Sequence, residues 1–220
     1  MQDPLIPVYF MPGMAASSDI FEHIVLPETS FETIRLDWFN PQKGMSLTEY
    51  AKAMLEHITH PNPVLVGVSF GGVLVQEMAR HIPTRKVIII SSVKQKKEMP
   101  RRLIFAKYTK AHKLLPTGMV NNIELLSKYA FGETVTKRLD LYERYLSIRN
   151  KTYLDWAIDQ MVRWDQQDFD PGIIHIHGEK DAVFPFEYIN DCIPVKNGTH
   201  TMIIHRYKWF NEHLPTIILE

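Results

Sequence analysis

The sequence predicts an α/β fold: a mainly parallel sheet of about six strands, with helices on both faces and a helical cap inserted at the fourth-to-fifth core strand. The first observation is that short apolar runs rich in β-branched residues alternate with amphipathic segments along most of the chain. The second is that residues 94–165 interrupt this alternation, because they are rich in Lys, Arg, Tyr and Leu and contain no clear strand. We therefore assign residues 1–93 and 166–220 to the core and residues 94–165 to a helical lid.

The predicted strands differ in pattern. Residues 6–11 form an apolar run that ends at Pro12-Gly13, which is typical of a buried strand followed by a turn. Residues 31–38 alternate, whereas residues 86–93 are nearly continuously β-branched, as expected of a strand buried on both faces of a parallel sheet. The predicted strands lie within residues 6–11, 31–38, 64–68, 86–93, 172–181 and 192–195.

Two helices flank this set. Residues 46–58 place apolar side chains at helical spacing, and Ser46 with Glu49 forms the capping-box pattern that begins a helix. Residues 202–214 are expected to form the closing helix.

Residues 65–76, "LVGVSFGGVLVQ", contain the strongest local signal for chemistry. A β-favouring run precedes Ser69 and a segment with helical spacing follows it, so that Ser69 lies at a sharp strand-to-helix turn. Gly67 and Gly71 flank it in the G-x-S-x-G pattern of a nucleophile elbow, where bulky neighbours would clash. The alternative interpretation is a small residue in a tight turn, and distant residues decide between the two.

Two downstream residues favour the nucleophile. A serine hydroxyl needs a base within hydrogen-bond reach and a group that orients the base. Asp181 follows an apolar β-rich run, and His200 lies in the turn-rich sequence "NGTH" directly before the last helix. Because ligands of parallel sheets bind at the carboxyl ends of the strands, we expect both side chains on the same rim as Ser69.

The stretches "GVSFGG" (67–72), "HGEKDAVFP" (177–185) and "NGTHTMIIH" (197–205) together make the chain resemble the α/β-hydrolase family over nearly its whole length. The usual antiparallel opening hairpin of that family is missing, since the first strand leads straight into the Pro-Gly loop.

The resemblance implies a role for each matching position. Ser69 would attack the acyl carbon, His200 would move the proton and Asp181 would orient the imidazole. The backbone N–H groups of Met14 and Phe70 would form the oxyanion hole. Gly13, Gly67 and Gly71 would support the loop and the elbow, although Pro12 stands where the family usually has histidine.

Other residues could supply the base or the acid, or could bind a metal. His205 competes with His200 but falls inside a predicted helix, and Glu98 is the first carboxylate after the preceding strand. His175 and His177 share a strand face and could suggest a metal pair, but no third ligand lies at a useful spacing. We expect sheet packing and turn support from them, and no metal.

Composition limits the class of partner. The chain has 220 residues, 25 Lys plus Arg against 25 Asp plus Glu, and a single cysteine, Cys192. Equal charges give no indication of nucleic-acid binding, and no leader or membrane-length apolar run is evident, so we expect a cytoplasmic protein without a membrane span. Residues 93–113 are basic and interpreted as the solvated face of a lid helix, or as a surface that attracts an anionic acyl substrate or a membrane.

The sequence therefore predicts a serine hydrolase, of carboxylesterase or thioesterase type, that acts on a small-molecule acyl substrate without a cofactor. An acyltransferase with the same three residues, or a non-catalytic small-molecule-binding protein on this fold, remains as an alternative. A dinucleotide-binding protein is disfavoured, because the strand after "GVSFGG" ends without an acidic residue and the glycine spacing differs. The acyl and leaving groups, the lid residues that line the pocket and the oligomeric state are left open.

Overall fold

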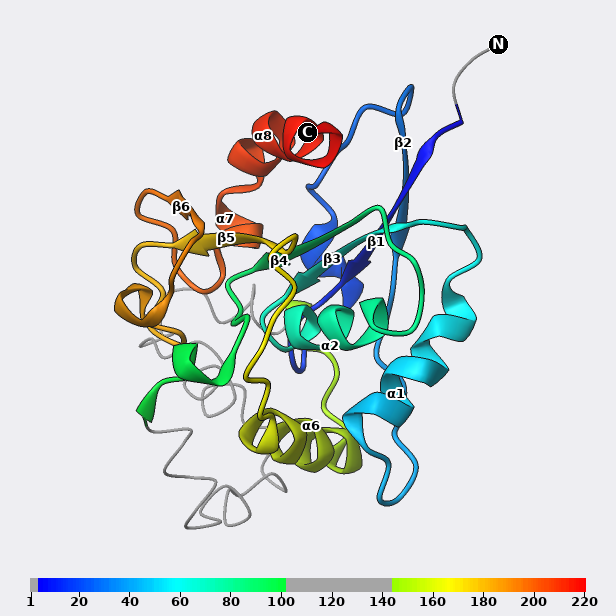
Figure 1. Ribbon diagram of the computed structural model, residues 1–220, viewed down its shortest axis with the longest axis vertical. Coiled ribbons are helices and arrows are strands. Elements are labelled where there is room, and N and C mark those ends of the chain that lie inside the picture. The colour runs from blue at the N-terminus through cyan, green and yellow to red at the C-terminus, as the bar shows by residue number, and fades with distance from the viewer. Residues whose placement is uncertain (1–3, 102–143) are drawn as a thin grey trace.

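The computed structural model describes residues 4–101 and 144–220, which form a six-stranded sheet covered by helices on both faces (Figure 1). The strand order is β2-β1-β3-β4-β5-β6, and each pair of neighbours is parallel. This confirms the predicted fold class, including a first strand that pairs only with parallel neighbours. The strands are β1 (Ile6–Met11), β2 (Phe31–Arg35), β3 (Val64–Val68), β4 (Lys86–Ile90), β5 (Ile174–Gly178) and β6 (Ile193–Val195).

The central strands are the most apolar because helices cover them from both sides. Every residue of β3 is buried, and its register runs from Val64 beside Lys86 to Val68 beside Ile90 of β4. The edge strand β2 exposes Glu32 and Arg35 instead. This contrast is the one expected between the middle and the edge of a parallel sheet.

The helices form two layers (Figure 1). Helices α1, α2 and α6 lie on one face, where α2 contacts both α1 and α6, and helices α7 and α8 lie on the other. The α-helices are α1 (Leu47–Met54), α2 (Phe70–Ala79), α6 (Lys151–Arg163), α7 (Met202–His205) and α8 (Tyr207–Leu219). Short 3-10 turns occur at η1 (Ser18–Phe21), η2 (Leu55–His57), η3 (Lys96–Glu98) and η6 (Phe186–Tyr188).

Several element boundaries differ from those predicted. The capping box of Ser46 and Glu49 is present, but the α-helix that it begins ends at Met54 and continues as η2. The predicted closing helix is two helices, because the backbone of Arg206 leaves the helical region at φ −111° and ψ 22°. The second of these helices extends past Pro215 to Leu219.

Only the two ends of the predicted lid lie among the described residues. They contain η3 on the outgoing side and α6 on the returning side, and the amide of Lys96 donates to the carbonyl of Gln166 at 2.8 Å. The lid boundaries at residues 94 and 165 therefore remain predictions. Residues 102–143, with most of the basic stretch 93–113, lie outside the described residues.

Helix α6 packs on the core through aromatic side chains. The Tyr153 ring of α6 contacts Trp38, with ring centroids 5.3 Å apart. The Trp156 ring of α6 stacks on Tyr50 of α1, with ring centroids 4.3 Å apart. The aromatic residues of this part of the predicted lid therefore belong to the core cluster.

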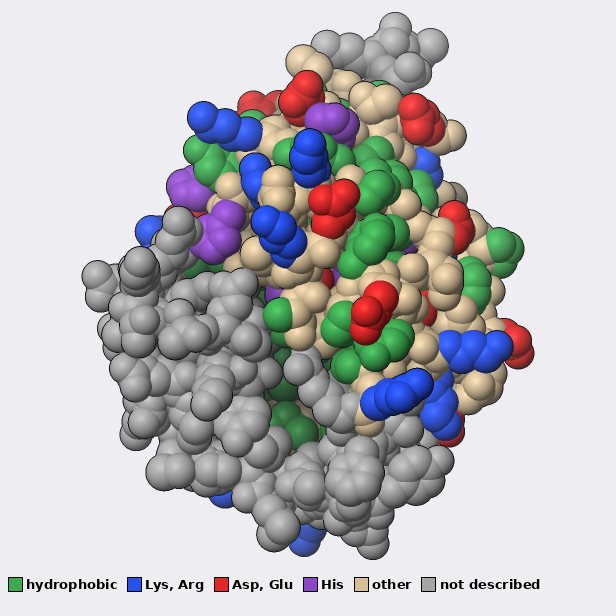
Figure 2. Space-filling model, turned by 90° about the vertical axis from the view of Figure 1, so that its left-hand side faces the viewer, with side chains coloured by type: hydrophobic (Ala, Val, Ile, Leu, Met, Phe, Trp, Pro, Cys, Tyr) green, Lys and Arg blue, Asp and Glu red, His purple; other side chains and the backbone are tan. Residues whose placement is uncertain are grey.

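The surface carries charges of both signs. On the face in Figure 2, the described Lys and Arg side chains are interspersed with Asp and Glu, as the equal numbers of the two kinds in the sequence predict. Within residues 4–101 and 144–220, none of the helices has the length and apolar character needed to cross a membrane.

Candidate active site

The backbone holds Ser69 at the sharp turn between β3 and α2. Its φ of 53° and ψ of −120° are unusual for a residue other than glycine. The Ser69 amide donates to the carbonyl of Ile90 at 2.9 Å, and the Ser69 carbonyl accepts from the Ser92 hydroxyl at 2.7 Å and the Gly72 amide at 2.9 Å. These contacts from β4 and α2 fix the serine in a conformation that the chain would otherwise avoid.

The two glycines of the elbow are required by close backbone approach. A Cβ atom on Gly67 would lie 2.4 Å from the carbonyl oxygen of Gly71. A Cβ atom on Gly71 would lie 2.3 Å from the carbonyl oxygen of Pro12 and 2.6 Å from that of Met11. The G-x-S-x-G pattern therefore reflects the packing of the elbow against itself and against the end of β1.

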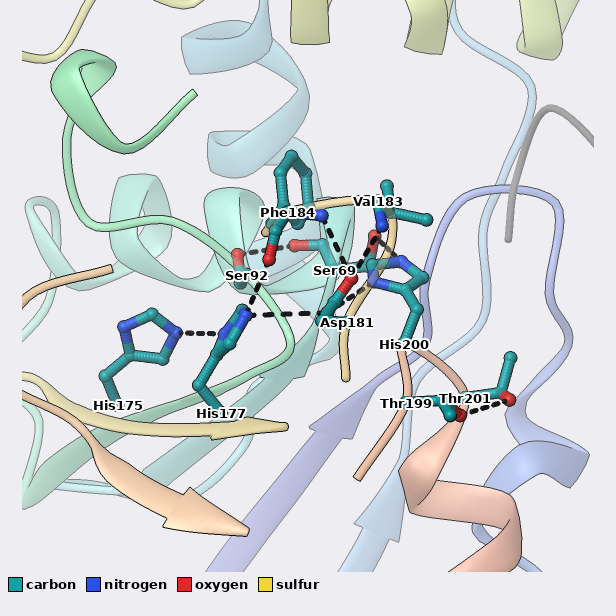
Figure 3. A network of polar contacts seen from close by, with 10 residues as sticks. All are labelled: Ser69, Ser92, His175, His177, Asp181, Val183, Phe184, Thr199, His200 and Thr201. Carbon is teal, nitrogen blue, oxygen red and sulfur yellow. Dashed lines mark hydrogen bonds and ion pairs between the residues drawn. The ribbon is translucent and has the colours of Figure 1, made fainter. Parts of the chain in front are cut away.

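His200 lies between the Ser69 hydroxyl and the Asp181 carboxylate (Figure 3). His200 Nε2 is 3.0 Å from Ser69 Oγ, and His200 Nδ1 is 2.9 Å from Asp181 Oδ2. A carboxylate only accepts, so Nδ1 carries the proton, and Nε2 presents a lone pair to the serine hydroxyl. The structure thus brings the three predicted residues together, although Asp181 and His200 follow Ser69 by 112 and 131 residues in the sequence.

The surroundings of Asp181 favour its charged form. Its Oδ1 accepts from the amides of Val183 at 2.8 Å and Phe184 at 2.9 Å, while Oδ2 faces His200. Burial works against the charge, but His200, His177 and the Phe184 amide together hold the pKa of Asp181 below its usual value of 3.8. Asp181 is therefore an anion at neutral pH, as a group that orients and stabilises a histidine requires.

The candidate oxyanion loop follows β1 and lies against the elbow. A Cβ atom on Gly13 would be 3.4 Å from the Cβ of Ser69, so Gly13 lies next to the serine. The Gly13 carbonyl accepts from Trp38 Nε1 at 2.9 Å, and the Trp38 ring stacks on Phe70 with centroids 5.4 Å apart. Trp38 therefore links Phe70 to the loop that carries Met14. Met14 and Phe70 are the two residues whose backbone N–H groups are predicted to form the oxyanion hole.

The returning end of the predicted lid is tied to the same loop. The amide of Ser17 donates to the carbonyl of Tyr145 at 2.9 Å, and the amide of Ile148 donates to the carbonyl of Ala15 at 3.1 Å. Ala15 has a positive φ of 64°, which is uncommon for alanine. The path of the chain beyond Met14 is thus set by residues more than a hundred positions away.

The competing residues have other surroundings. Glu98 is buried, its Oε2 accepts from the Lys94 amide at 2.5 Å, and burial raises the pKa of its carboxyl. His175 and His177 contact each other at 3.0 Å, and among the residues that the structure describes no group of three potential ligands could hold a metal ion.

The comparison with protein families decides the relationship of the chain. A model described as "alpha/beta hydrolase fold" matches residues 6–192. The chain belongs to this family. No curated protein matches it.

Solved structures of the alpha/beta hydrolase fold are similar to the whole chain at low sequence identity. A bromoperoxidase from Bacillus anthracis is 19% identical, with a TM-score of 0.73 over 98% of this chain and 92% of its own. An esterase from Exiguobacterium antarcticum is also 19% identical, with a TM-score of 0.68 over the same shares. The enol-lactonase from Burkholderia xenovorans LB400 is 14% identical, with a TM-score of 0.72 over 99% of this chain and 92% of its own. At these identities the likeness concerns the fold.

The sequence did not predict the contacts that three residues make around the candidate active site of this alpha/beta hydrolase. The pattern of residues 31–38 predicts a strand that reaches Trp38, but β2 ends at Arg35. The run 86–93 likewise predicts a strand that includes Ser92, but β4 ends at Ile90. His177 was expected to support a turn, but its contact with the turn after Asp181 was not specified. The "HGEKD" motif is the one signal that could have directed attention to His177, because it places the histidine four residues before the acid.

Proposed function

We propose that the chain is a serine hydrolase that cleaves a carboxylic ester or thioester through an acyl-enzyme. The observation that carries this proposal is the continuous contact from Ser69 Oγ through His200 to the Asp181 carboxylate, with both distances at or below 3.0 Å. A serine in a tight turn has no need of a histidine aligned on it, nor of a buried anion behind that histidine. Membership of the alpha/beta hydrolase fold family supports the proposal.

The reaction would proceed in two steps. Ser69 Oγ attacks the acyl carbon while its proton moves to His200 Nε2, and Asp181 stabilises the imidazolium that forms. The bond to the leaving alcohol or thiol breaks as His200 returns the proton to it, leaving the acyl group on Ser69. Water then attacks the acyl carbon, His200 takes its proton, and the carboxylic acid leaves as Ser69 Oγ recovers a proton.

The developing oxyanion would be bound by two backbone amides. Phe70 begins α2 directly after Ser69, and Met14 follows Gly13, which lies next to Ser69. A donor of this kind typically contributes about 3 kcal/mol to the transition state.

The test is labelling with a fluorophosphonate probe, read by intact mass, on the wild-type protein and on the Ser69→Ala and His200→Ala variants. We expect one adduct on the wild type and none on either variant, with all three proteins folded by circular dichroism. Hydrolysis of p-nitrophenyl acetate and of an acetyl thioester should follow the same order. A folded wild-type protein that forms no adduct and hydrolyses neither substrate would contradict the proposal and favour a binding protein.

Hydrolysis and acyl transfer use the same acyl-enzyme and differ in the second nucleophile. Adding methanol or glycerol to the p-nitrophenyl acetate assay separates them, because a transferase produces the new ester in excess of acetate. We expect acetate as the main product.

A further inference from the structure

Two buried histidines lie on β5 behind the acid of the candidate active site (Figure 3). His175 and His177 are 2% and 0% exposed and, being two residues apart on a strand, point to the same side of the sheet. His175 Nε2 is 3.0 Å from His177 Nδ1, and His177 Nε2 is 2.9 Å from the carbonyl oxygen of Phe184. The chemistry proposed above uses neither histidine.

These contacts determine where the protons are. A carbonyl oxygen only accepts, so His177 Nε2 must carry a proton and donate it to Phe184. His177 Nδ1 is then a lone pair in the neutral ring, and it accepts from His175 Nε2. In a neutral His175 ring the single proton is then on Nε2, and the buried Nδ1 is a lone pair. The geometry therefore favours one proton on each ring, always at Nε2.

The charged groups around the pair leave it neutral. His177 Nε2 is 3.6 Å from Asp181 Oδ2, and His200 lies on the other side of that carboxylate. The positive charge of Lys94 acts on His175. Burial lowers the pKa of His177, although Asp181 acts in the opposite direction. Burial, His177 and Lys94 together lower the pKa of His175 well below its usual value. A neutral His177 does not compete with His200 for the charge of Asp181.

The contact with Phe184 connects His177 to the orientation of the acid. The carbonyl that His177 holds belongs to Phe184, whose own amide, with that of Val183, donates to Asp181 Oδ1. With Oδ1 held by these two amides, Oδ2 is left facing His200. Without the donor at His177, the Phe184 carbonyl would be buried and unpaired, and the turn that carries the two amides would have to rearrange.

We propose that His177 is a positioning residue of the acid–base pair: from a neutral ring it fixes the turn 181–184, and the His175 Nε2–H group donates to its Nδ1 lone pair. This inference rests on the proposed function, because positioning matters only where His200 acts as a base. It predicts that the orientation of Asp181, and with it the basicity of His200, depends on a donor at position 177.

The first test needs no activity, and its result is read from the wild-type protein. In ¹⁵N-labelled wild-type protein, imidazole NMR should show His175 and His177 as Nε2–H tautomers that are still neutral at the pH where an ordinary histidine, with a pKa of about 6.5, is half protonated. The His175→Gln and His177→Gln spectra assign the signals. An Nδ1–H tautomer at His177, or titration near the ordinary value of about 6.5, would overturn the proposal.

The second test separates positioning from packing. His177→Gln keeps a donor near the Nε2 position, whereas His177→Phe keeps the ring size and removes the donor. We expect His177→Phe to lower the rate of fluorophosphonate labelling by about 10- to 100-fold, because Asp181 is no longer held against the imidazole. His177→Gln should stay within about 3-fold of the wild-type rate.

His175→Phe is the matched control, since it replaces a buried histidine on the same face of the same strand. Phe184 still requires a proton on His177 Nε2 in this variant, so the loss should be smaller than in His177→Phe. Equal losses in the two phenylalanine variants, or a loss in folded His177→Gln as large as that in His177→Phe, would overturn the proposal.

The two proposals fail in different ways. If the wild type forms no adduct at Ser69, the proposed function fails, and the tautomers of His175 and His177 still show whether His177 donates to Phe184. If the wild type labels and folded His177→Phe labels equally fast, the role of His177 fails and the proposed function stands. If His177→Phe does not fold, the wild-type tautomers decide.

Discussion

The two halves of the candidate active site are built by different means. The nucleophile half, at the junction of β3 and α2, is held by backbone: Gly67 and Gly71 allow peptide groups to approach closely, and main-chain hydrogen bonds fix Ser69. The acid–base half, in the loops after β5 and β6, is held by side chains: Asp181 and His200 contact each other and the turn at Val183 and Phe184. The first half depends on residues that are small, and the second on residues that carry particular donors and acceptors.

This difference predicts how each half fails when it is changed. A substitution in the acid–base half should remove chemistry while the fold survives, because a side-chain contact can be lost without moving the backbone. A substitution in the nucleophile half should destabilise the fold, because the new atoms have no room.

The largest expected effect is on the rate in Asp181→Asn. The amide cannot both accept from His200 Nδ1–H and stabilise an imidazolium as a carboxylate does, so we expect the rate of p-nitrophenyl acetate hydrolysis to fall by about 10⁴-fold. Asp191→Asn is the control, since Asp191 is exposed and contacts Lys94 instead. A variant at position 181 that retains a tenth of the rate would show that Asp181 does not orient the base.

Gly71→Ala should have the largest effect on stability. Its Cβ would lie 2.3 Å from the Pro12 carbonyl, a backbone atom that moves only if the end of β1 moves. We expect a loss of about 3 kcal/mol in the free energy of unfolding, measured in urea. Gly44→Ala isolates the backbone cost: Gly44 has φ 80° with nothing within 4 Å of the new atom, so about 1 kcal/mol is expected. Equal losses at the two positions would refute the steric account of the elbow.

The pH dependence of stability should report the charge on Asp181. Its pKa in the folded protein lies below 3.8, so the unfolded chain takes up the proton first as the pH falls. The carboxylate therefore stabilises the fold above about pH 4, and this contribution is lost as the pH drops through the lowered pKa. Urea unfolding at about pH 6 and pH 3 should show a larger loss for the wild type than for Asp181→Asn; parallel losses would mean that the carboxylate is not stabilised in the fold.

The smallest expected effect separates two neighbouring serines. The Ser92 hydroxyl donates to the Ser69 carbonyl at 2.7 Å, whereas the Ser91 hydroxyl is buried without a hydrogen-bond partner in the described residues. Ser92→Ala should cost about 1 kcal/mol of stability and slow labelling of Ser69 by a few fold, and Ser91→Ala should cost nothing measurable. If Ser91→Ala proves the more damaging, the Ser92 contact does not support the elbow.

The same contrast explains what could be predicted from the sequence. The elbow was predicted in detail because its requirements are local: a strand, two glycines around Ser69 and a helix follow one another within the chain. Asp181 and His200 could be placed on the rim because carboxyl ends of parallel strands converge. Their geometry could not, since it depends on where two loops carry their side chains.

The contacts that were missed join segments that no local pattern connects. Trp38 binds the Gly13 carbonyl from 25 residues away, and Ser92 binds the Ser69 carbonyl from 23 residues away. Whether such a donor meets such an acceptor depends on the complete path of the backbone between them. The break at Arg206 was missed for a related reason, because the apolar pattern of residues 202–214 continues across it.

The contact between Gly71 and Pro12 has a consequence for variation at the oxyanion loop. The elbow meets the carbonyl oxygen of position 12, an atom that every amino acid supplies, and so it places no demand on the side chain there. Proline can therefore stand at this position, where the family resemblance led us to expect histidine, without disturbing the fit of the elbow. Pro12 is itself buried, so the residues around its ring, and not the elbow, limit the side chain at position 12, whereas the elbow directly excludes a side chain at position 71.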